Sequence, residues 1–415
     1  MRPNNALFDE RRPAAIARCS TPTDVQACLS AAAGRVPVAA RSGGHSYVGN
    51  SAPDGGLVLD LSAMSTVRMQ GGNAVIGAGA RLADVYAAVA SAGRALPGGS
   101  CPTVGVAGLT LGGGVGVLSR AYGLTCDHLV EAQIVTADGT VRTASAASEP
   151  DLFWALRGGG GGNFGVVTSF TFATFPAPSL SAFYIRYPSA AWSALIPAWQ
   201  HWVANAPRQL WSMLHIDAGD PADIFAVGSY VGSAAGLNKL LDTLTSEVGY
   251  APAASSVRSF GYLDAMRYFA GTNVREGFVA SSRMLAKPLA DPQRLLNLVH
   301  AHPGLSLLID SAGGAIADVA PQDTAFWHRQ ALATVQIYGK ATTATRAAVT
   351  AQVAAMGAGL SALGADGGYV NYLDPTLPDW LKQYYGGNAS RLLDVARRYD
   401  PDRVFTGPGL LNSAL

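Results

Sequence analysis

One uncharged, glycine-rich stretch constrains this chain more than any other feature. Residues 95–119, ALPGGSCPTVGVAGLTLGGGVGVLS, carry no charged side chain and hold eight glycines and a single cysteine, Cys101. A second glycine-flanked segment, RSGGHS at 41–46, holds His45. Glycine lets backbone N–H groups come close to a flat or anionic ligand, because no side chain holds that ligand away. The two segments therefore predict loops that close on a cofactor and present Cys101 and His45 on turns.

Length and composition indicate a two-domain globular chain. Its 415 residues are too many for one compact core. Hydrophobic residues make up 49% and charged residues 14% of the chain, as in a well-buried protein. The net charge of +1 is spread without a basic block, which argues against nucleic acid as a partner. Residues 95–119 are long enough to span a bilayer, but their glycines and prolines would leave backbone groups unpaired in lipid, so we expect no membrane segment.

The N-terminus and the remaining cysteines bear on the compartment. MRPNNALFDERRP lacks the apolar core of a secretory signal, so we expect the chain as given to be cytoplasmic, or secreted if an export signal has been removed. Cys19, Cys28 and Cys126 show no metal-ligand spacing, and no metal site is predicted. We interpret Cys19 and Cys28 as small buried apolar residues, with a disulfide between them as the alternative. The sequence indicates no oligomeric state.

The first part of the chain has the pattern of short strands with helices between them. A helix is predicted at 22–33, because a threonine cap precedes it and Asp24 lies in its first turn. An Asp-Gly turn joins two later strands. Apolar and β-branched runs predict strands at 12–19, 36–44, 56–62, 129–139, 140–146 and 162–175. The βαβ start indicates an α/β layer.

Residues 74–93 resemble a dinucleotide-binding fingerprint at first sight. A strand runs into Gly77-Ala78-Gly79 and then into a helix, but Leu82 occupies the third glycine position. No P-loop with its lysine occurs in the chain. The two glycines instead predict a tight strand-to-helix turn.

A domain boundary is predicted at the proline-rich PAPS of 176–179, where the pattern changes. Beyond it, strands at 224–232, 305–314 and 328–340 indicate an antiparallel sheet, covered by a helix at 342–364. Another helix is predicted at 190–207, where large apolar side chains recur at helical spacing: Trp192, Ile196, Trp199 and Val203. Such aromatic residues can stack on sugars, but this spacing favours core packing.

Four groups of motifs carry a resemblance to a known family. They are RRPAAIARC with VAARSGGHSYVG, then PGGSCPTVGVAGLTLGGGVGVLSRAYGLTCD, then DLFWALRGGGGGNFGVVTSF, and last YVNYLD with YDPDRVF. Together they closely resemble the berberine bridge enzyme-like flavoprotein oxidases of the vanillyl-alcohol oxidase superfamily. The resemblance is weakest between about 176 and 320. It implies an α+β, two-domain PCMH-type fold, with a discontinuous FAD-binding domain (1–176 and 369–415) and an antiparallel-sheet substrate domain covered by helices (177–368).

The same resemblance implies FAD bound through two covalent bonds, one to His45 and one to Cys101. Its pyrophosphate contacts fall on Arg41, Ser42, Gly43, Gly44 and Ser46, whose N–H groups can form an anion nest. The adenine and ribose side falls on the stretch with Gly105, Gly108, Gly112, Gly113, Gly114 and Gly116. The segment that closes over the cofactor includes Gly162, Asn163, Gly165 and Val166, and the tail adds Tyr369 and Asn371. No metal is implied.

For catalysis, the resemblance points to Tyr372 as the base that deprotonates a substrate hydroxyl. Tyr369 and Tyr372 are three apart, so on a strand they would point to opposite faces. Tyr338 and Gln336 are further pocket candidates, and Thr334 stands where some family members have a lysine that assists the tyrosine. Val104, three residues after Cys101, resembles the residue that admits O2 in oxidases.

The sequence therefore predicts an FAD-linked oxidase. It would convert a hydroxyl group of a sugar or secondary metabolite, a small-molecule substrate, to a carbonyl, pass hydride to flavin, and be reoxidised by O2 with release of hydrogen peroxide. The alternative enzyme is an oxidative cyclisation or desaturation of a secondary metabolite on the same scaffold. A flavin-bearing binding protein without turnover is disfavoured by the presence of His45, Cys101 and Tyr372 together.

Overall fold

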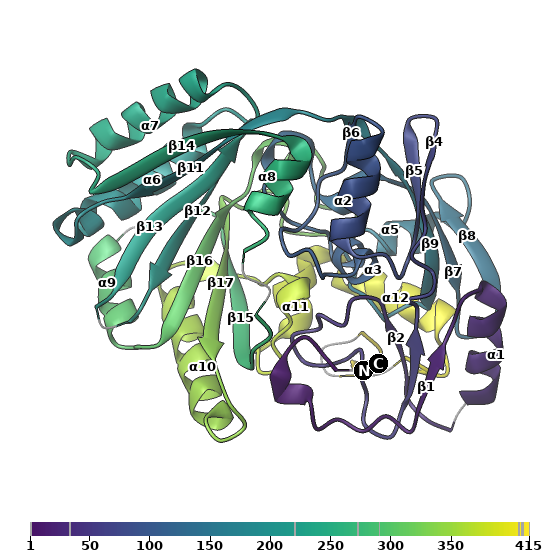
Figure 1. Cartoon of the computed structure of the whole chain (residues 1–415). Coiled ribbons are helices and arrows are strands. Elements are labelled where there is room, and N and C mark those ends of the chain that lie inside the picture. Colours follow the sequence, from purple (N-terminus) through teal and green to yellow (C-terminus); the bar gives the residue numbers. More distant parts are fainter. Residues whose placement is uncertain are drawn as a thin grey trace.

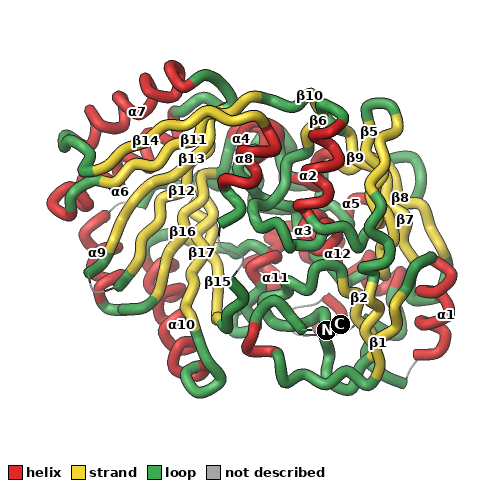
Figure 2. The backbone as a smooth tube through the Cα atoms, in the orientation of Figure 1, coloured by secondary structure: helices red, strands yellow, loops and turns green. Residues whose placement is uncertain are grey.

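The computed structural model describes residues 2–32, 35–219, 221–271, 274–289, 291–405, 407 and 411–414. Two sheet-containing regions lie side by side, and Figure 1 shows the C-terminal helices returning to the region that holds the N-terminus. Figure 2 shows loops and turns filling much of the space between the two regions. The single-turn 3-10 helices are η1 (Ala6–Phe8), η2 (Thr125–His128), η3 (Ser189–Ala191), η4 (Gly314–Ile316), η5 (Val370–Tyr372), η6 (Gly386–Asn388) and η7 (Leu411–Ser413).

The chain begins with the expected βαβ unit. Its three strands pair in parallel in the order β1-β3-β2. The helix is capped as the sequence predicts, because the Asp24 N–H donates to Thr21 Oγ1 at 3.2 Å. The elements are β1 (Ala15–Arg18), α1 (Pro22–Ala32), β2 (Val38–Arg41) and β3 (Leu57–Asp60); the last residue of the predicted helix, Ala33, lies outside the described residues.

A five-stranded antiparallel sheet completes this region, with the order β4-β5-β9-β7-β8. Its strands are β4 (Val67–Gln70), β5 (Asn73–Gly77), β7 (Leu129–Val135), β8 (Val141–Ser145) and β9 (Val166–Ala173). The helices between them are α2 (Leu82–Ser91), α3 (Val106–Leu111), α4 (Ser119–Tyr122) and α5 (Pro150–Ala155), and a short pair joins β6 (Arg94–Ala95) to β10 (Phe175–Pro176).

Gly77 and Gly79 are required by close backbone approach. A Cβ on Gly77 would lie 2.1 Å from the Met64 carbonyl oxygen, and one on Gly79 would lie 1.8 Å from that of Leu61. Any side chain there would push the 61–64 segment away from the strand-to-helix junction. The structural interpretation of this glycine pair is therefore confirmed, with packing as its physical reason.

The second region is built on an eight-stranded sheet of order β14-β11-β13-β12-β16-β17-β15-β18, paired antiparallel throughout. The strands are β11 (Ser179–Arg186), β12 (Leu210–Asp217), β13 (Asp223–Tyr230), β14 (Ala254–Gly261), β15 (Phe278–Leu285), β16 (Leu305–Ser311), β17 (Ala333–Lys340) and β18 (Ala365–Asp366). The helices of this region are α6 (Trp192–Asn205), α7 (Ala234–Val248), α8 (Tyr262–Tyr268), α9 (Pro292–His300) and α10 (Arg346–Ala362).

The two faces of this sheet differ because side chains alternate along a strand. On β12, Leu210, Leu214 and Ile216 are buried in a core shared with α6, α7, α9 and α10. Trp211, Met213 and His215 point to the opposite face, toward the first region. The sheet thus packs helices on one side and leaves the other side to form the wall of a cavity.

The tail returns to the first region through α11 (Trp380–Tyr385) and α12 (Ala389–Tyr399). The Tyr399 hydroxyl donates to Glu149 at 2.5 Å, and Arg391 pairs with Asp151 at 2.7 Å. Sheet partners change between Pro176 and Ser179, and β18 is the last strand of the second sheet. The domain limits themselves stay a prediction.

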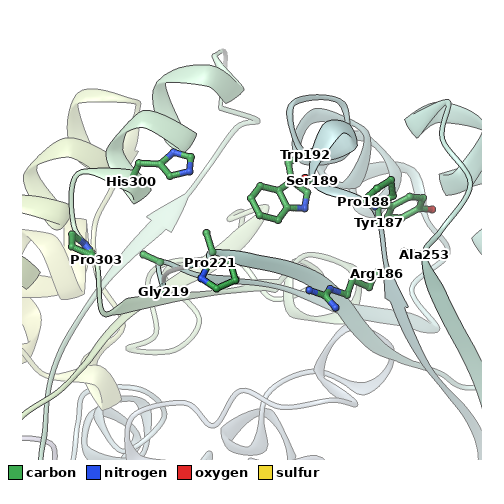
Figure 3. Close-up of a pocket in the computed structure, with 12 residues that line it drawn as sticks. Arg186, Tyr187, Pro188, Ser189, Trp192, Gly219, Pro221, Ala253, His300 and Pro303 are labelled. Carbon is green, nitrogen blue, oxygen red and sulfur yellow. The ribbon is translucent and has the colours of Figure 1, made fainter.

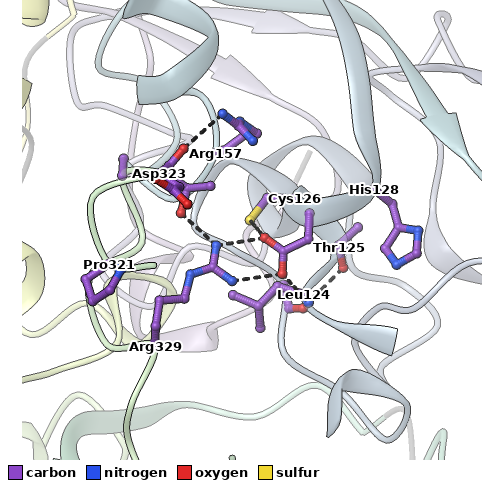
Figure 4. A network of polar contacts seen from close by, with 12 residues as sticks. Leu124, Thr125, Cys126, His128, Arg157, Pro321, Asp323 and Arg329 are labelled. Atoms are coloured by element: carbon purple, nitrogen blue, oxygen red, sulfur yellow. Dashed lines mark hydrogen bonds and ion pairs between the residues drawn. The ribbon is translucent and has the colours of Figure 1, made fainter. Parts of the chain in front are cut away.

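A buried ion pair ties the segment before β17 to the first region (Figure 4). Arg329 donates to both carboxylate oxygens of Asp127, at 2.8 and 2.7 Å, and to Thr324 Oγ1 at 2.6 Å. Arg329 is fully buried, so loss of its partner would leave an uncompensated charge in the interior. This contact holds in place the segment before β17, which includes Phe326. The Phe326 ring packs edge-to-face on Tyr369.

Candidate active site

The candidate site is a cavity of about 940 Å³ between the two regions. Both glycine segments, η5 and the inner face of the eight-stranded sheet contribute to its wall. The structure brings most of the predicted site residues together there, and their individual roles stay predictions. Those that line it are Ser42, Gly43, Gly44, His45, Ser46, Cys101, Val104, Gly105, Gly108, Gly116, Gly162, Asn163, Gly165, Gln336, Tyr338, Tyr369, Asn371 and Tyr372.

Arg41 and Val166 are not among the residues that line this cavity, and their role as cofactor contacts stays a prediction. The Arg41 guanidinium turns away and donates to the Arg2 carbonyl at 2.5 Å. Gly44 makes room for it, since a Cβ there would lie 2.6 Å from Arg41 Cζ. Val166 is fully buried in the core of the five-stranded sheet.

Gly112, Gly113 and Gly114 are also not among the residues that line this cavity, and their contacts to the cofactor stay a prediction. A Cβ would collide with Asn371 at Gly112, with Phe326 at Gly113 and with Thr125 at Gly114. These three glycines are needed for packing against the tail and the neighbouring loop. Composition alone could not separate them from the glycines that face the cavity.

The two glycine segments touch each other through bare backbone. A Cβ on Gly105 would lie 2.2 Å from Gly43 N and 2.1 Å from Ser42 Oγ. Gly108, by contrast, lines the cavity and has no heavy atom within 4 Å of its Cβ position. At Gly43, Gly105 and Gly108 the cavity wall is backbone without side chains, which fits a long, flat, phosphate-bearing cofactor such as FAD.

His45 and Cys101 both face this cavity. His45 Nε2 lies 2.9 Å from Thr103 Oγ1, and burial together with the charges of Arg81 and Arg41 lowers the pKa of the imidazole to about 4. The ring is therefore neutral at pH 7 and keeps a lone pair for bond formation. Cys101 is exposed to the cavity, yet the surrounding protein still raises the pKa of its thiol by desolvation.

The other cysteines lie away from this chemistry. All four cysteines are free thiols, and Cys19 and Cys126 are buried while Cys28 is half-buried. Burial, with the neighbouring Cys28 thiol, raises the pKa of Cys19 to about 12. Cys19 and Cys28 thus occupy core positions as small apolar residues. Within the described residues, no group of His, Cys, Asp or Glu is arranged to hold a metal ion.

The prediction that Tyr369 and Tyr372 point to opposite faces of a strand is wrong. The segment forms the 3-10 helix η5, and the Tyr372 N–H donates to the Tyr369 carbonyl at 2.8 Å. Residues three apart lie above one another in a 3-10 helix, so both phenols face the cavity. Their rings meet edge-to-face with centroids 4.9 Å apart.

The two phenols have different surroundings. The Tyr369 oxygen accepts from the N–H groups of Gly114 and Val115 at 3.1 and 3.3 Å and from Asn371 Nδ2 at 2.9 Å. The Tyr372 hydroxyl makes no hydrogen bond to the described residues. Burial, the Tyr47 ring and Asp310 hold the pKa of Tyr372 well above its usual value. Tyr369 is held as an acceptor, whereas the Tyr372 hydroxyl is free to meet a substrate.

Asp310 is a site residue that sequence reasoning missed. It lies on β16 opposite Met213 and Thr334 and lines the cavity. Desolvation raises the pKa of its carboxyl to about 7. A carboxylate inside the apolar run LSLLIDS was the available signal, since a buried acid in a strand needs a reason.

Tyr47 was also missed, although it lies two residues after His45. Its ring stacks on Tyr372 with centroids 5.2 Å apart and planes 10° apart, and its hydroxyl accepts from Gln336 Nε2 at 2.7 Å. Tyr338 donates to Glu276 at 2.8 Å, and burial with this carboxylate raises the pKa of Tyr338. Gln336 therefore positions the ring that supports Tyr372, and Tyr338 is engaged elsewhere.

Comparisons with known proteins agree with this geometry. The FAD binding domain family matches residues 13–145, and the family "Berberine and berberine like" matches residues 368–408. An uncharacterized FAD-linked oxidoreductase of Bacillus subtilis is 36% identical over 97% of this chain and 92% of its own length. The chitooligosaccharide oxidase of Gibberella zeae is 33% identical over 95% of this chain and 86% of its own.

Solved structures show the same fold. A chitooligosaccharide oxidase superposes with a TM-score of 0.92 and 29% identity, covering 99% of this chain and 94% of the other. A structure of the Acremonium strictum glucooligosaccharide oxidase, whose description names a 6-S-cysteinyl, 8α-N1-histidyl FAD, superposes with a TM-score of 0.87 and 29% identity. The match covers 99% of this chain and 94% of the other.

These findings confirm the PCMH-type fold and FAD as the cofactor. Within the described residues, no helix is long and apolar enough to cross a membrane. The chain is an FAD-dependent oxidoreductase that belongs to the berberine bridge enzyme-like family of FAD-linked oxidases.

Proposed function

We propose that this chain oxidises a hydroxyl group of a carbohydrate to a carbonyl, with Tyr372 as the base. The observation that carries the proposal is the free Tyr372 hydroxyl, which shares one cavity with Asp310, His45 and Cys101. Similar enzymes are oxidases of chitooligosaccharides and glucooligosaccharides. Bound FAD, held by covalent bonds to His45 and Cys101, would accept the hydride and pass electrons to O2 with release of hydrogen peroxide.

The residues of the chain supply the proton chemistry. Tyr372 takes the proton of the substrate hydroxyl, and Asp310, which lines the same cavity, is the group that can take up a proton from this site when its own carboxyl is ionised. Among the described residues, no cation is found to lower the pKa of Tyr372. Thr334, which pairs with Asp310 across the sheet, is buried and uncharged. A phenol with a raised pKa is a strong base once it is deprotonated, so the pair suits abstraction from an alcohol.

We propose that Val104 controls the access of O2, the electron acceptor, to the reduced flavin. Its N–H donates to the Cys101 carbonyl at 3.2 Å, and the residue lines the same cavity as Cys101. Replacing it by a larger residue, as in Val104→Leu, should slow reoxidation by O2 much more than reduction by substrate. Equal oxygen rates in the two proteins would place oxygen access elsewhere.

A second candidate function is oxidative cyclisation or desaturation of a secondary metabolite. The observation that favours it is the apolar part of the cavity wall, made by Trp211, Met213, Leu308 and Phe269, which suits a flat apolar substrate.

One screen separates the two functions. Mono- and oligosaccharides, simple alcohols and phenolic scaffolds are mixed anaerobically with the protein, and bleaching of the flavin absorbance is followed; peroxide release is then measured in air. Bleaching by saccharides supports the first function. Bleaching by phenolic scaffolds alone would replace it by the second.

A further inference from the structure

A second cavity, of about 650 Å³, opens at one end of the eight-stranded sheet, beside its covering helices (Figure 3). We call it the Trp192 cavity, after the residue at the start of α6 that lines it. The ends of β11 and α9 contribute Arg186 and His300. Its volume lies in the range of small-molecule sites. None of its residues lines the 940 Å³ cavity that holds Tyr372, His45 and Cys101, which we call the catalytic cavity.

Trp192 presents apolar surface to this cavity. The side chain is half-buried, while its Nε1 atom is buried and has no hydrogen-bond partner among the described residues. The exposed part of the indole is therefore carbon. Trp199, the other aromatic residue of the helical set Trp192, Ile196, Trp199 and Val203, is fully buried in the core. Trp192 thus differs from Trp199 in being only half-buried, and its exposed surface can stack on a ligand.

The polar groups among the described residues that line it carry little net charge. Arg186 Nε donates to Asp223 at 2.8 Å, so the guanidinium charge is already balanced. His300 is exposed at the end of α9, and Ser189 adds a hydroxyl. A balanced cation is a weak site for phosphate or carboxylate, and hydrogen-bonding groups at the rim do not suit a lipid chain. A neutral ligand with both hydroxyl groups and a C–H face fits this chemistry, and a pyranose ring has both.

The position of the cavity relates it to the catalytic one. Asp217, the last residue of β12, lines the catalytic cavity, and the next two residues, Ala218 and Gly219, line the Trp192 cavity. Pro303 of the Trp192 cavity likewise lies three residues before Ser306 of the catalytic one. Both cavities therefore have lining residues at the same end of the sheet, and a chain-shaped ligand that occupies both would pass around that end.

We propose that the Trp192 cavity is a second carbohydrate-binding site, which holds a part of the saccharide chain that is not oxidised. The inference rests on the proposed function for the identity of the ligand. It assigns affinity for long chains to Trp192, and chemistry to Tyr372.

The test compares short and long probes in Trp192→Ala, with Trp192→Phe and His300→Ala as further variants. The probes are the disaccharides and hexasaccharides of the chito-, gluco- and xylo- series. The KM for the hexasaccharide that the protein oxidises should rise about tenfold in Trp192→Ala, as when an aromatic anchor is truncated. The KM for the disaccharide and both kcat values should stay unchanged. Trp192→Phe should recover most of the affinity, and His300→Ala, an exposed change, should give a smaller rise.

Tyr250→Ala is the matched control, because Tyr250 is an exposed aromatic residue of the same region outside both cavities. It should leave every KM unchanged. An equal KM change for disaccharide and hexasaccharide in Trp192→Ala, or no change for either, would overturn the inference.

Binding without turnover keeps this test separate from the proposed function. Hexasaccharide affinity is measured by calorimetry in Tyr372→Phe protein, with and without Trp192→Ala. Loss of affinity on removal of Trp192 supports the second site even if no saccharide bleaches the flavin, a result that would sink only the proposed function. Unchanged affinity, or no binding of any hexasaccharide, contradicts the second site.

Discussion

The two walls of the catalytic cavity are built differently. The glycine wall presents bare backbone, and at Gly105 a single added methyl group would strike Gly43 and Ser42. The sheet wall presents side chains, with Trp211, Met213 and His215 alternating along β12. Where the glycine wall packs backbone against backbone, as at Gly105, it accepts almost no substitution, whereas a side-chain wall can change its ligand one residue at a time. This difference explains why the sequence predicts the cofactor from its glycine motifs but does not predict the substrate.

Removing the Tyr372 hydroxyl should give the largest effect on rate. General-base catalysis contributes on the order of a hundred- to ten-thousand-fold, so flavin reduction in Tyr372→Phe should fall by a comparable factor. Flavin content and unfolding temperature should hardly change, because the ring still stacks on Tyr47. Rapid-mixing absorbance under anaerobic conditions measures the rate.

Tyr369→Phe provides the contrast to that variant. It removes the acceptor of three hydrogen bonds, so two buried N–H groups lose a partner. A stability loss of roughly 1–3 kcal/mol is expected, with a smaller effect on rate than Tyr372→Phe has. If Tyr369→Phe abolishes reduction and Tyr372→Phe does not, the assignment of the base is reversed.

Gly108→Ala and Gly105→Ala should separate cofactor binding from folding. The Cβ of Gly108→Ala enters open space in the cavity wall on helix α3, where alanine favours the helix, so the protein should fold as well as the wild type but bind less flavin. Gly105→Ala should impair folding itself, because its Cβ meets backbone. Thermal unfolding and the ratio of flavin to protein absorbance are the measurements. Full flavin content in Gly108→Ala would show that the cofactor does not pass this wall.

Asp310 predicts the pH dependence on the sheet wall. Desolvation raises the pKa of its carboxyl to about 7, so the ionised form that accepts a proton is present above that pH and is lost below it. The kcat/KM of the wild type should therefore rise as pH increases through about 7. Asp310→Asn should be slow at every pH and lack this limb. If kcat/KM still rises with pH through about 7 in Asp310→Asn, a group other than Asp310 causes that rise.

The sequence predicts most of the fold because its signals are local. The Thr21 cap, the Asp-Gly turn before β8 and the alternation in the strands each depend on neighbouring residues, and the structure has all three. The strand at YVNYLD fails for a tertiary reason. Tyr369 reaches Gly114 and Val115, far away in the sequence, and this contact selects a 3-10 turn over an extended chain.

The site shows the same division between local and tertiary information. His45 and Cys101 stand in segments whose composition is unusual by itself, so they are found without a structure. Asp310 and Tyr47 acquire their roles only through partners on other elements, Tyr372 above all. Gly112, Gly113 and Gly114 have a packing role that the sequence does not reveal, because only their neighbours across the fold show what an added side chain would meet.

Intact mass under denaturing conditions tests the central claim most directly: that the two glycine segments present His45 and Cys101 to one flavin. The native protein should exceed its polypeptide mass by one FAD. His45→Ala and Cys101→Ala should each keep the flavin through the remaining bond, and the double variant should release it on acid precipitation. Free FAD released from the denatured native protein would contradict the account.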